Sequence, residues 1–106
     1  MANTYKIIVF TPESHADVVR DAMASAGAGK IGTYSHCSFS SRGIGRFKPE
    51  QGANPTIGKV GELEAVEEER IEVVASARVV GNVLAAIKRV HPYDAVAIDV
   101  YPLENW

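Results

Sequence analysis

The sequence predicts an α+β domain in which an antiparallel four-stranded sheet carries two helices on one face. Apolar residues recur at helical spacing in two stretches, and each stretch follows one rich in β-branched and aromatic residues. A glycine-rich stretch lies between these two β-α-β units and argues against a third helix. The alternative, a small parallel α/β fold, would need more strands and a helix in that linking stretch.

The first strand is expected at residues 4–10, where apolar side chains on both faces indicate a central place in the sheet. A helix is expected to follow at once. Thr11 can cap its start, Pro12 suits its first position, and Glu13 favours the positive end of its dipole. Its buried stripe is expected to comprise Val18, Val19, Ala22, Met23 and Ala26.

Four further elements complete the predicted order. Alternating side chains indicate a second strand over residues 34–41, more polar than the first and so nearer an edge, and a third strand over residues 69–77. A second helix is expected over residues 79–90, with Pro92 ending it, and a last strand over residues 95–101. This β-α-β-β-α-β order predicts a single ferredoxin-like domain over residues 1–106, with a long loop between strands two and three.

Composition limits the classes of function. The net charge is −2, so no global field attracts nucleic acid or an anionic membrane, and neither is expected as a partner. There is one cysteine, Cys37, which excludes an intrachain disulfide, and a small buried side chain is its expected role. The N-terminus shows no secretory pattern and the longest apolar run is far too short to span a bilayer, so a cytoplasmic location is expected.

The stretch from residue 40 to residue 62 holds five of the nine glycines. Residues 42–61, the basic half of a loop whose acidic half is the run 62–69, are expected to be an exposed recognition loop. Glycines let backbone N–H groups approach an anion closely, and arginine can clamp it with two hydrogen bonds. A nucleotide phosphate or an organic acid would suit such a site. The expected ligand-binding residues are Arg42, Gly43, Gly45, Arg46, Phe47, Lys48, His91 and Tyr93.

Two other readings of this loop remain open. The glycines could serve only a bulge or a turn, and the basic half could pair with the acidic run 62–69, within the chain or across a subunit boundary. A protein partner could also bind there. The run Glu67-Glu68-Glu69 is expected to be a solvated strand entry. A connection this long is uncommon in a compact domain unless it has a role or is disordered.

The short motif His91-Pro92-Tyr93-Asp94 ends the second predicted helix. It can be read as a helix stop and a turn, or as the edge of a site. The negative end of the helix dipole would favour a cationic His91. A divalent metal is the cofactor that the chain could hold, with His91, Asp94 and His36 as candidate ligands, although the spacing shows no complete ligand set. His36 and Cys37, as neighbours on a strand, would face opposite ways and could not easily share a metal.

Several motifs together resemble a known family: the insert domain of the YqfO branch of the Nif-three-like proteins, similar in fold to the CutA and PII families. The resemblance covers about residues 5–103. The motifs that carry it are Gly32-Thr33-Tyr34-Ser35-His36-Cys37-Ser38-Phe39, Gly43-Ile44-Gly45-Arg46-Phe47-Lys48-Pro49, Gly52-Ala53-Asn54-Pro55-Thr56-Ile57-Gly58, Glu69-Arg70-Ile71-Glu72, His91-Pro92-Tyr93-Asp94 and Asp99-Val100-Tyr101-Pro102-Leu103.

The resemblance implies a ferredoxin-like fold and homo-oligomers, often trimers. In the full-length relatives, segments flanking the insert build a dinuclear metal site, so a stand-alone insert domain would lack that site and has no established activity. In PII proteins the corresponding long loop contacts nucleotides and partner proteins, an analogy at the level of the fold. Open sheet edges also favour pairing between subunits, and Trp106 is expected to pack on the domain or on a neighbour.

The function expected from these observations is a non-enzymatic, oligomeric binding or regulatory module of the PII/CutA type, whose loop contacts a small anionic ligand or a partner. A CutA-type protein that binds divalent metal is the main alternative. An assembly subunit with the loop as its interface is another. An enzyme is less favoured, because the sequence offers no nucleophile–base pair and no paired carboxylates at useful spacing.

Overall fold

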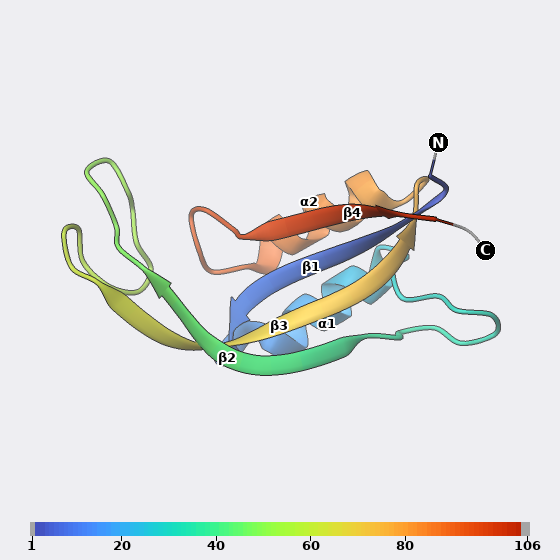
Figure 1. Ribbon diagram of the computed structural model, residues 1–106, viewed down its shortest axis with the longest axis horizontal. Coiled ribbons are helices and arrows are strands. Elements are labelled where there is room, and N and C mark those ends of the chain that lie inside the picture. The colour runs from blue at the N-terminus through green and yellow to red at the C-terminus, as the bar shows by residue number, and fades with distance from the viewer. Residues whose placement is uncertain (1, 105–106) are drawn as a thin grey trace.

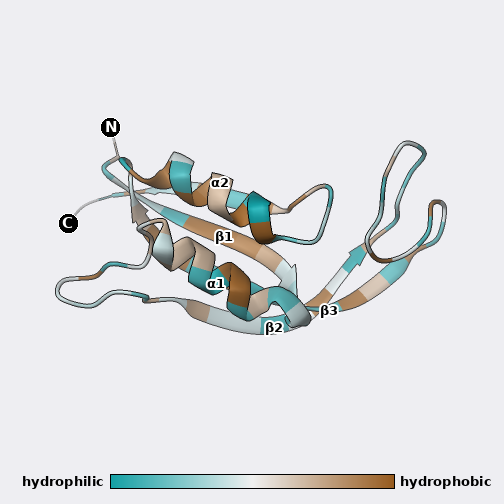
Figure 2. Cartoon of the chain, turned by 180° about the vertical axis from the view of Figure 1, so that it is seen from behind, coloured by the Kyte–Doolittle hydropathy of each residue, from teal (hydrophilic) through white to brown (hydrophobic). Residues whose placement is uncertain are grey.

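The computed structural model describes residues 2–104, so the expectation for Trp106 lies outside the described residues. Within them, one sheet contains four strands in the order β2-β3-β1-β4, and every neighbouring pair is antiparallel. Both helices cover the same face of this sheet (Figures 1 and 2). The predicted α+β class and ferredoxin-like order are confirmed. The elements are β1 (Thr4–Pro12), α1 (Ala16–Ser25), β2 (Phe39–Phe47), β3 (Glu64–Ser76), α2 (Val80–Val90) and β4 (Ile98–Leu103).

The core lies between the sheet and the two helices. On β1 and β3, alternate side chains point at the helices, as the period of a strand requires. The prediction for α1 was right for Val19 and Met23, which are fully buried, but wrong for Val18, which is 45% exposed. The buried members of this core cluster are Ile7, Val9, Ala16, Val19, Met23, Ala28, Ile71, Val73, Ala75, Val83 and Ile87.

The start of the first helix differs from the prediction. β1 continues through Thr11 to Pro12, because its pairing with β3 extends as far as the Pro12–Glu68 pair. The Thr11 hydroxyl donates to the Pro12 carbonyl and caps no helix. A single 3₁₀ turn, Glu13–His15, then leads into α1. Sheet pairing therefore overrides a local helix-start signal.

The second strand is displaced along the sequence from the predicted span of 34–41. β2 pairs with β3 from Phe39 opposite Glu72 to Phe47 opposite Glu64, so the first part of the expected loop is strand. His36 lies instead in the preceding connection, in the left-handed region with φ 61°, and the argument from opposite strand faces does not apply to it. Cys37 is half-buried rather than buried. β3 begins five residues earlier than expected, and β4 three residues later.

The true connection between β2 and β3 is therefore residues 48–63, at the far end of the β2–β3 hairpin (Figure 1). This hairpin extends beyond the helices and lengthens the molecule to 46 Å, against 26 and 23 Å in the other two directions. Its connection is held to itself by backbone hydrogen bonds, including one from the Gly61 N–H to the Pro49 carbonyl. The glycines thus serve a folded loop at the tip of a strand pair.

One arginine fastens α1 to the sheet. The Arg20 guanidinium donates to Glu69 at 2.6 Å and to Ser40 at 3.0 Å, and it also reaches Asp17 on its own helix at 2.6 Å. Glu69 is only 9% exposed, and the ion pair with Arg20 offsets the cost of removing its charge from water. The expectation of a solvated acidic run was therefore wrong for Glu69, and it was also wrong for Glu68, which is 7% exposed.

Among the described residues, no helix has the length and apolar character needed to cross a lipid bilayer.

Candidate functional site

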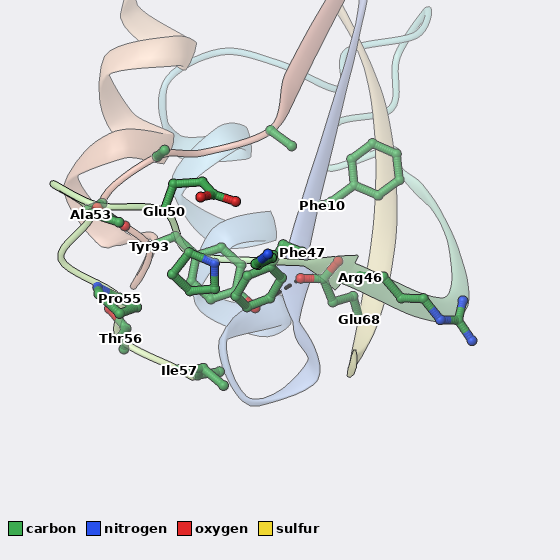
Figure 3. A pocket seen from close by; sticks show the side chains of 16 residues that line it. Phe10, Arg46, Phe47, Glu50, Ala53, Pro55, Thr56, Ile57, Glu68 and Tyr93 are labelled. Carbon is green, nitrogen blue, oxygen red and sulfur yellow. Dashed lines mark hydrogen bonds between the residues drawn. The ribbon is translucent and has the colours of Figure 1, made fainter. Parts of the chain in front are cut away.

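A cavity of about 460 Å³ lies where the ends of β1, β2 and β3 meet the loop 48–63 and the connection between α2 and β4 (Figure 3). Its walls are mainly apolar, with a small number of polar groups among them, which is the usual character of a small-molecule site. The apolar lining residues are Phe10, Phe47, Pro49, Ala53, Pro55, Ile57, Ala95 and Ala97, and the polar ones include Arg46, Lys48, Glu50, Thr56, Glu68, Tyr93 and Asp94.

The central polar contact of this cavity joins Glu68 on β3 to Tyr93 after α2. The Tyr93 hydroxyl donates to Oε2 of Glu68 at 2.9 Å (Figure 3). Burial, reinforced by the hydrogen bond and the charge of Glu68, raises the pKa of Tyr93 well above its ordinary value. The phenol therefore stays protonated and acts as the donor. The carboxylate has no cationic side chain within 4 Å among residues 2–104.

Gly45 on β2 makes room for this carboxylate. A Cβ atom at Gly45 would lie 1.9 Å from Oε1 of Glu68, far inside van der Waals contact. The glycine is thus needed for a close approach between the strand backbone and a side chain of the neighbouring strand. This role differs from the predicted one, in which the glycines bring backbone N–H groups toward an anion.

His91 does not line the cavity but makes hydrogen bonds to two residues that do, Phe10 and Tyr93. It is 7% exposed, its Nε2 donates to the Phe10 carbonyl at 2.8 Å, and its Nδ1 accepts the Tyr93 N–H at 3.1 Å. This pair of bonds fixes the neutral tautomer that carries its proton on Nε2. The imidazole also meets the Tyr93 ring edge-on, with centroids 5.0 Å apart. His91 therefore positions Tyr93.

Burial lowers the pKa of His91, although the Phe10 carbonyl and the charge of Glu68 act in the opposite direction. The expectation that the helix dipole favours a cationic His91 is therefore not met, because desolvation is the larger effect. The unfolded chain gains a proton at this residue below about pH 6.5, whereas the folded chain resists it. The stability due to neutral His91 is thus complete above about pH 6.5 and declines as the pH falls toward the lower folded pKa.

We expect the free energy of unfolding to depend less on pH between about 6.5 and 5 in His91→Gln than in the wild type, because this variant cannot take up the proton. Urea unfolding at a series of pH values measures the difference in slope. His36→Gln is the matched control, since His36 is exposed and should keep the wild-type slope. Equal slopes in all three proteins would show that the pKa of His91 is not lowered by folding.

Two hydrogen bonds join the loops on either side of the cavity. The Asn54 N–H donates to Oδ2 of Asp94 at 3.0 Å, and the Thr56 hydroxyl donates to the Pro92 carbonyl. The Phe47 and Tyr93 rings pack against each other, with centroids 5.8 Å apart at 57°. The loop 48–63 is thereby tied to the connection that carries Tyr93.

The structure brings together five of the eight predicted ligand-binding residues. Those that line the cavity are Gly45, Arg46, Phe47, Lys48 and Tyr93. His91 lies outside the lining and accepts a hydrogen bond from the Tyr93 N–H. Arg42 and Gly43 line a separate hollow. The Arg42 Nε lies 3.2 Å from a Glu13 carboxylate oxygen. In Figure 3 the Arg46 guanidinium points away from Phe47 and Tyr93.

Sequence reasoning missed Glu68 and Phe10 as members of this site. Glu68 lies between two other glutamates and Phe10 ends an apolar run, so neither stands out in a linear pattern. The signal that identifies Glu68 is the pairing of β3 with β1 and β2, which puts it next to Gly45 and opposite Pro12. This signal is visible only in the folded chain.

The candidate metal ligands do not fit a metal site within this chain. Both ring nitrogens of His91 are engaged in hydrogen bonds, and Asp94 accepts the Asn54 N–H. His36 lines a different hollow, beside Asp17 and Cys37. No group of three or more His, Cys, Asp or Glu side chains in the described part of the chain could hold a metal ion. Metal binding therefore stays a prediction, and this geometry does not favour it.

Comparisons with known proteins identify close relatives of the chain, although no family model matches it. It is 52% identical over 101 residues to the "GTP cyclohydrolase 1 type 2 homolog" of Halalkalibacterium halodurans. This alignment covers 95% of this chain and 27% of the relative. The protein of the same name from Bacillus subtilis is 52% identical over 100 residues, covering 94% and 27%. The chain thus spans about a quarter of the length of these relatives.

Among solved structures, one match has a similar identity and two others are more distant. A Bacillus cereus protein related to NIF3 matches with a TM-score of 0.85 and 48% identity, over 98% of this chain and 26% of that one. The periplasmic divalent cation tolerance protein CutA from Archaeoglobus fulgidus matches with a TM-score of 0.71 and 18% identity, over 97% and 86%. The B. subtilis GlnK–ATP complex gives a TM-score of 0.64 and 19% identity, over 97% and 84%.

The last two likenesses show the fold alone, whereas the identities near 50% show common descent over almost all of this chain. The resemblance expected from the sequence motifs is confirmed: this chain is homologous to one segment of the YqfO branch of the Nif-three-like proteins, and that segment has the fold of the CutA and PII proteins.

Proposed function

We propose that this chain is a non-enzymatic, cytoplasmic binding module with a regulatory role, which holds a small molecule in the cavity between Glu68 and Tyr93. The observation that carries the proposal is the cavity itself, about 460 Å³ with mainly apolar walls and convergent polar side chains. Its two loops are joined by hydrogen bonds before any ligand binds, which lowers the ordering cost of binding.

The basic side chains at this cavity support an anionic group on the ligand. Arg46 lies at the end of β2, and Lys48 is the first residue after this strand. The apolar Phe47 separates them in the sequence. A ligand with an apolar body would be buried against Phe47 while its anionic group meets Lys48 at the rim. The GlnK neighbour was solved with ATP, which makes nucleotides sensible probes.

Assembly into homo-oligomers, with a trimer favoured, is part of the same proposal. β2 is an edge strand, and Phe39 and Ile44 on it are 67% and 49% exposed. Exposed apolar groups on an open edge favour pairing with another subunit or with a protein partner. The cavity is next to this edge, so a ligand bound there could influence such a contact.

Thermal unfolding with nucleotides, 2-oxo acids and inorganic phosphate tests the proposal. A ligand at one hundred times its Kd stabilises the folded state by about 2.7 kcal/mol, which for a domain of this size raises Tm by roughly ten degrees or more. We expect at least one probe to do so, and Lys48→Gln to weaken it about fivefold or more through the loss of one charge-assisted contact.

Lys59→Gln is the matched control, because Lys59 is an exposed cation in the same loop that does not line the cavity. It should bind the same probe within about twofold of the wild type, as a screened surface charge does. The proposal would be contradicted if no probe raised Tm, or if the two lysine variants were equally weakened.

A further inference from the structure

Glu68 is an unusual group to find beside an apolar cavity. Its side chain is 7% exposed, and its hydrogen bond within residues 2–104 comes from the Tyr93 hydroxyl. Buried carboxylates in proteins are normally paired with a cation or surrounded by donors, because desolvation of the charge is costly. Here the described residues supply a single donor, which leaves capacity for others.

The two carboxylate oxygens have different surroundings. Oε2 accepts the Tyr93 hydroxyl, whereas Oε1 lies over the Cα of Gly45, at the place that a Cβ would occupy. Glu68 lines the main cavity and also the neighbouring hollow beside Arg42 and Gly43. The missing side chain at Gly45 therefore leaves room for Oε1, and the described residues supply no hydrogen-bond donor to this oxygen.

The Tyr93 hydroxyl adds to this acceptor character. Its proton is committed to Glu68, so the phenolic oxygen can only accept a further hydrogen bond. Since the pKa of Tyr93 is raised, the phenol does not ionise and this arrangement persists through the neutral pH range. The polar centre of the cavity thus offers acceptors without a free donor from Glu68 or Tyr93.

We infer that Glu68 determines the specificity of this site by accepting N–H donors, so that the ligand carries an amino or amidine group on a flat apolar body. The inference rests on the proposed binding function and deepens it. A ligand with an N–H donor at one end and an anionic group at the other would satisfy Glu68 in the cavity and Lys48 at its rim. The aromatic rings of Phe47 and Tyr93 would contact its flat body.

Benzamidine and benzoate are the probes that separate this inference from the proposed function. They have the same shape and size, but benzamidine is a cationic N–H donor and benzoate an anionic acceptor. Titration of ¹⁵N-labelled protein, followed through the amide signals of residues 45–48 and 93–97, measures both affinities. We expect benzamidine to bind at least about tenfold more tightly than benzoate, as a desolvated carboxylate requires.

Glu68→Gln tests the residue itself, because it keeps the size of the side chain and an acceptor for the Tyr93 hydroxyl. It should lose about tenfold or more in affinity for benzamidine while its affinity for benzoate stays equal or rises. Glu67→Gln is the matched control, since Glu67 is the exposed neighbour on β3 and points to the opposite face. It should leave both affinities unchanged.

Gly45→Ala gives a second variant that does not alter the charge. The new methyl group must displace the end of the Glu68 side chain, which is flexible, so the fold should tolerate it. Benzamidine binding should fall as in Glu68→Gln. Tighter binding of benzoate than of benzamidine, or equal benzamidine affinity in wild type and Glu68→Gln, would overturn the inference. Benzoate or phosphate bound at these residues would still leave the proposed function standing, whereas silence from every probe would end both.

Discussion

Replacing Ile71 by alanine is expected to lower the free energy of unfolding by about 2 to 5 kcal/mol, the range seen when a large buried aliphatic side chain is truncated. Ile71 is fully buried at the middle of β3, opposite Val9 on β1 and Ser40 on β2. Its side chain belongs to the core beneath both helices. Truncation removes apolar contacts and leaves a cavity that a sheet paired on both sides cannot close easily.

Urea unfolding of Ile71→Ala and Ile44→Ala makes this a matched comparison. Ile44 is the same residue type on the neighbouring strand β2, but it is 49% exposed, and its truncation should change stability by less than about 1 kcal/mol. Similar losses in both variants would mean that the core does not lie where the helices cover β3.

A second large effect is expected at Gly29, where alanine should cost about 2 to 4 kcal/mol through backbone strain and overlap together. Gly29 has φ +80°, and a Cβ there would lie 2.6 Å from the carbonyl oxygen and 2.9 Å from the nitrogen of Cys37. Both atoms are backbone and cannot move independently. The Gly29 N–H donates to the Val74 carbonyl at 2.7 Å, and its own carbonyl accepts the Cys37 N–H at 2.8 Å, so a shift would also weaken these bonds.

Gly81→Ala is the informative control for this glycine. Gly81 lies within α2, and a Cβ there meets no atom within 4 Å. Alanine at this position should raise stability by up to about 1 kcal/mol, because it favours the helix. The two variants should therefore shift the urea midpoint in opposite directions. An unchanged midpoint for Gly29→Ala would contradict the described path of the chain around Gly29, and a loss for Gly81→Ala would contradict the open space described at that position of α2.

Much of the fold could be predicted from the sequence because its signals are local. The apolar run of β1 and the helical spacing of α2 are set by residues next to one another, and both were correct within a few residues. β2 was misplaced because most of its residues are polar or glycine. Its position depends on hydrogen bonding with β3, residue by residue from Phe39 to Phe47, which no local pattern reveals. Thr11 failed as a cap for the same reason, since sheet pairing continues past it.

The site was predictable in part. Phe47, Lys48 and Tyr93 were predicted as ligand-binding residues because basic and aromatic residues stand out in a glycine-rich stretch or beside a proline, and all three line the cavity. Glu68 was not, since three consecutive glutamates look alike in sequence, while on a strand one of them points to a different face from its neighbours. The charge state of His91 was mistaken because burial and its two hydrogen bonds depend on the fold.

Small molecules are expected to enter the cavity between Glu68 and Tyr93, and a crystal of this chain soaked with benzamidine would show them as electron density at a defined place. We expect an amidine group within hydrogen-bond distance of the Glu68 carboxylate, with its ring against Phe47 and Tyr93. An empty cavity at saturating concentration, or a Phe47 or Tyr93 side chain that fills it, would mean that this cavity is not a binding site.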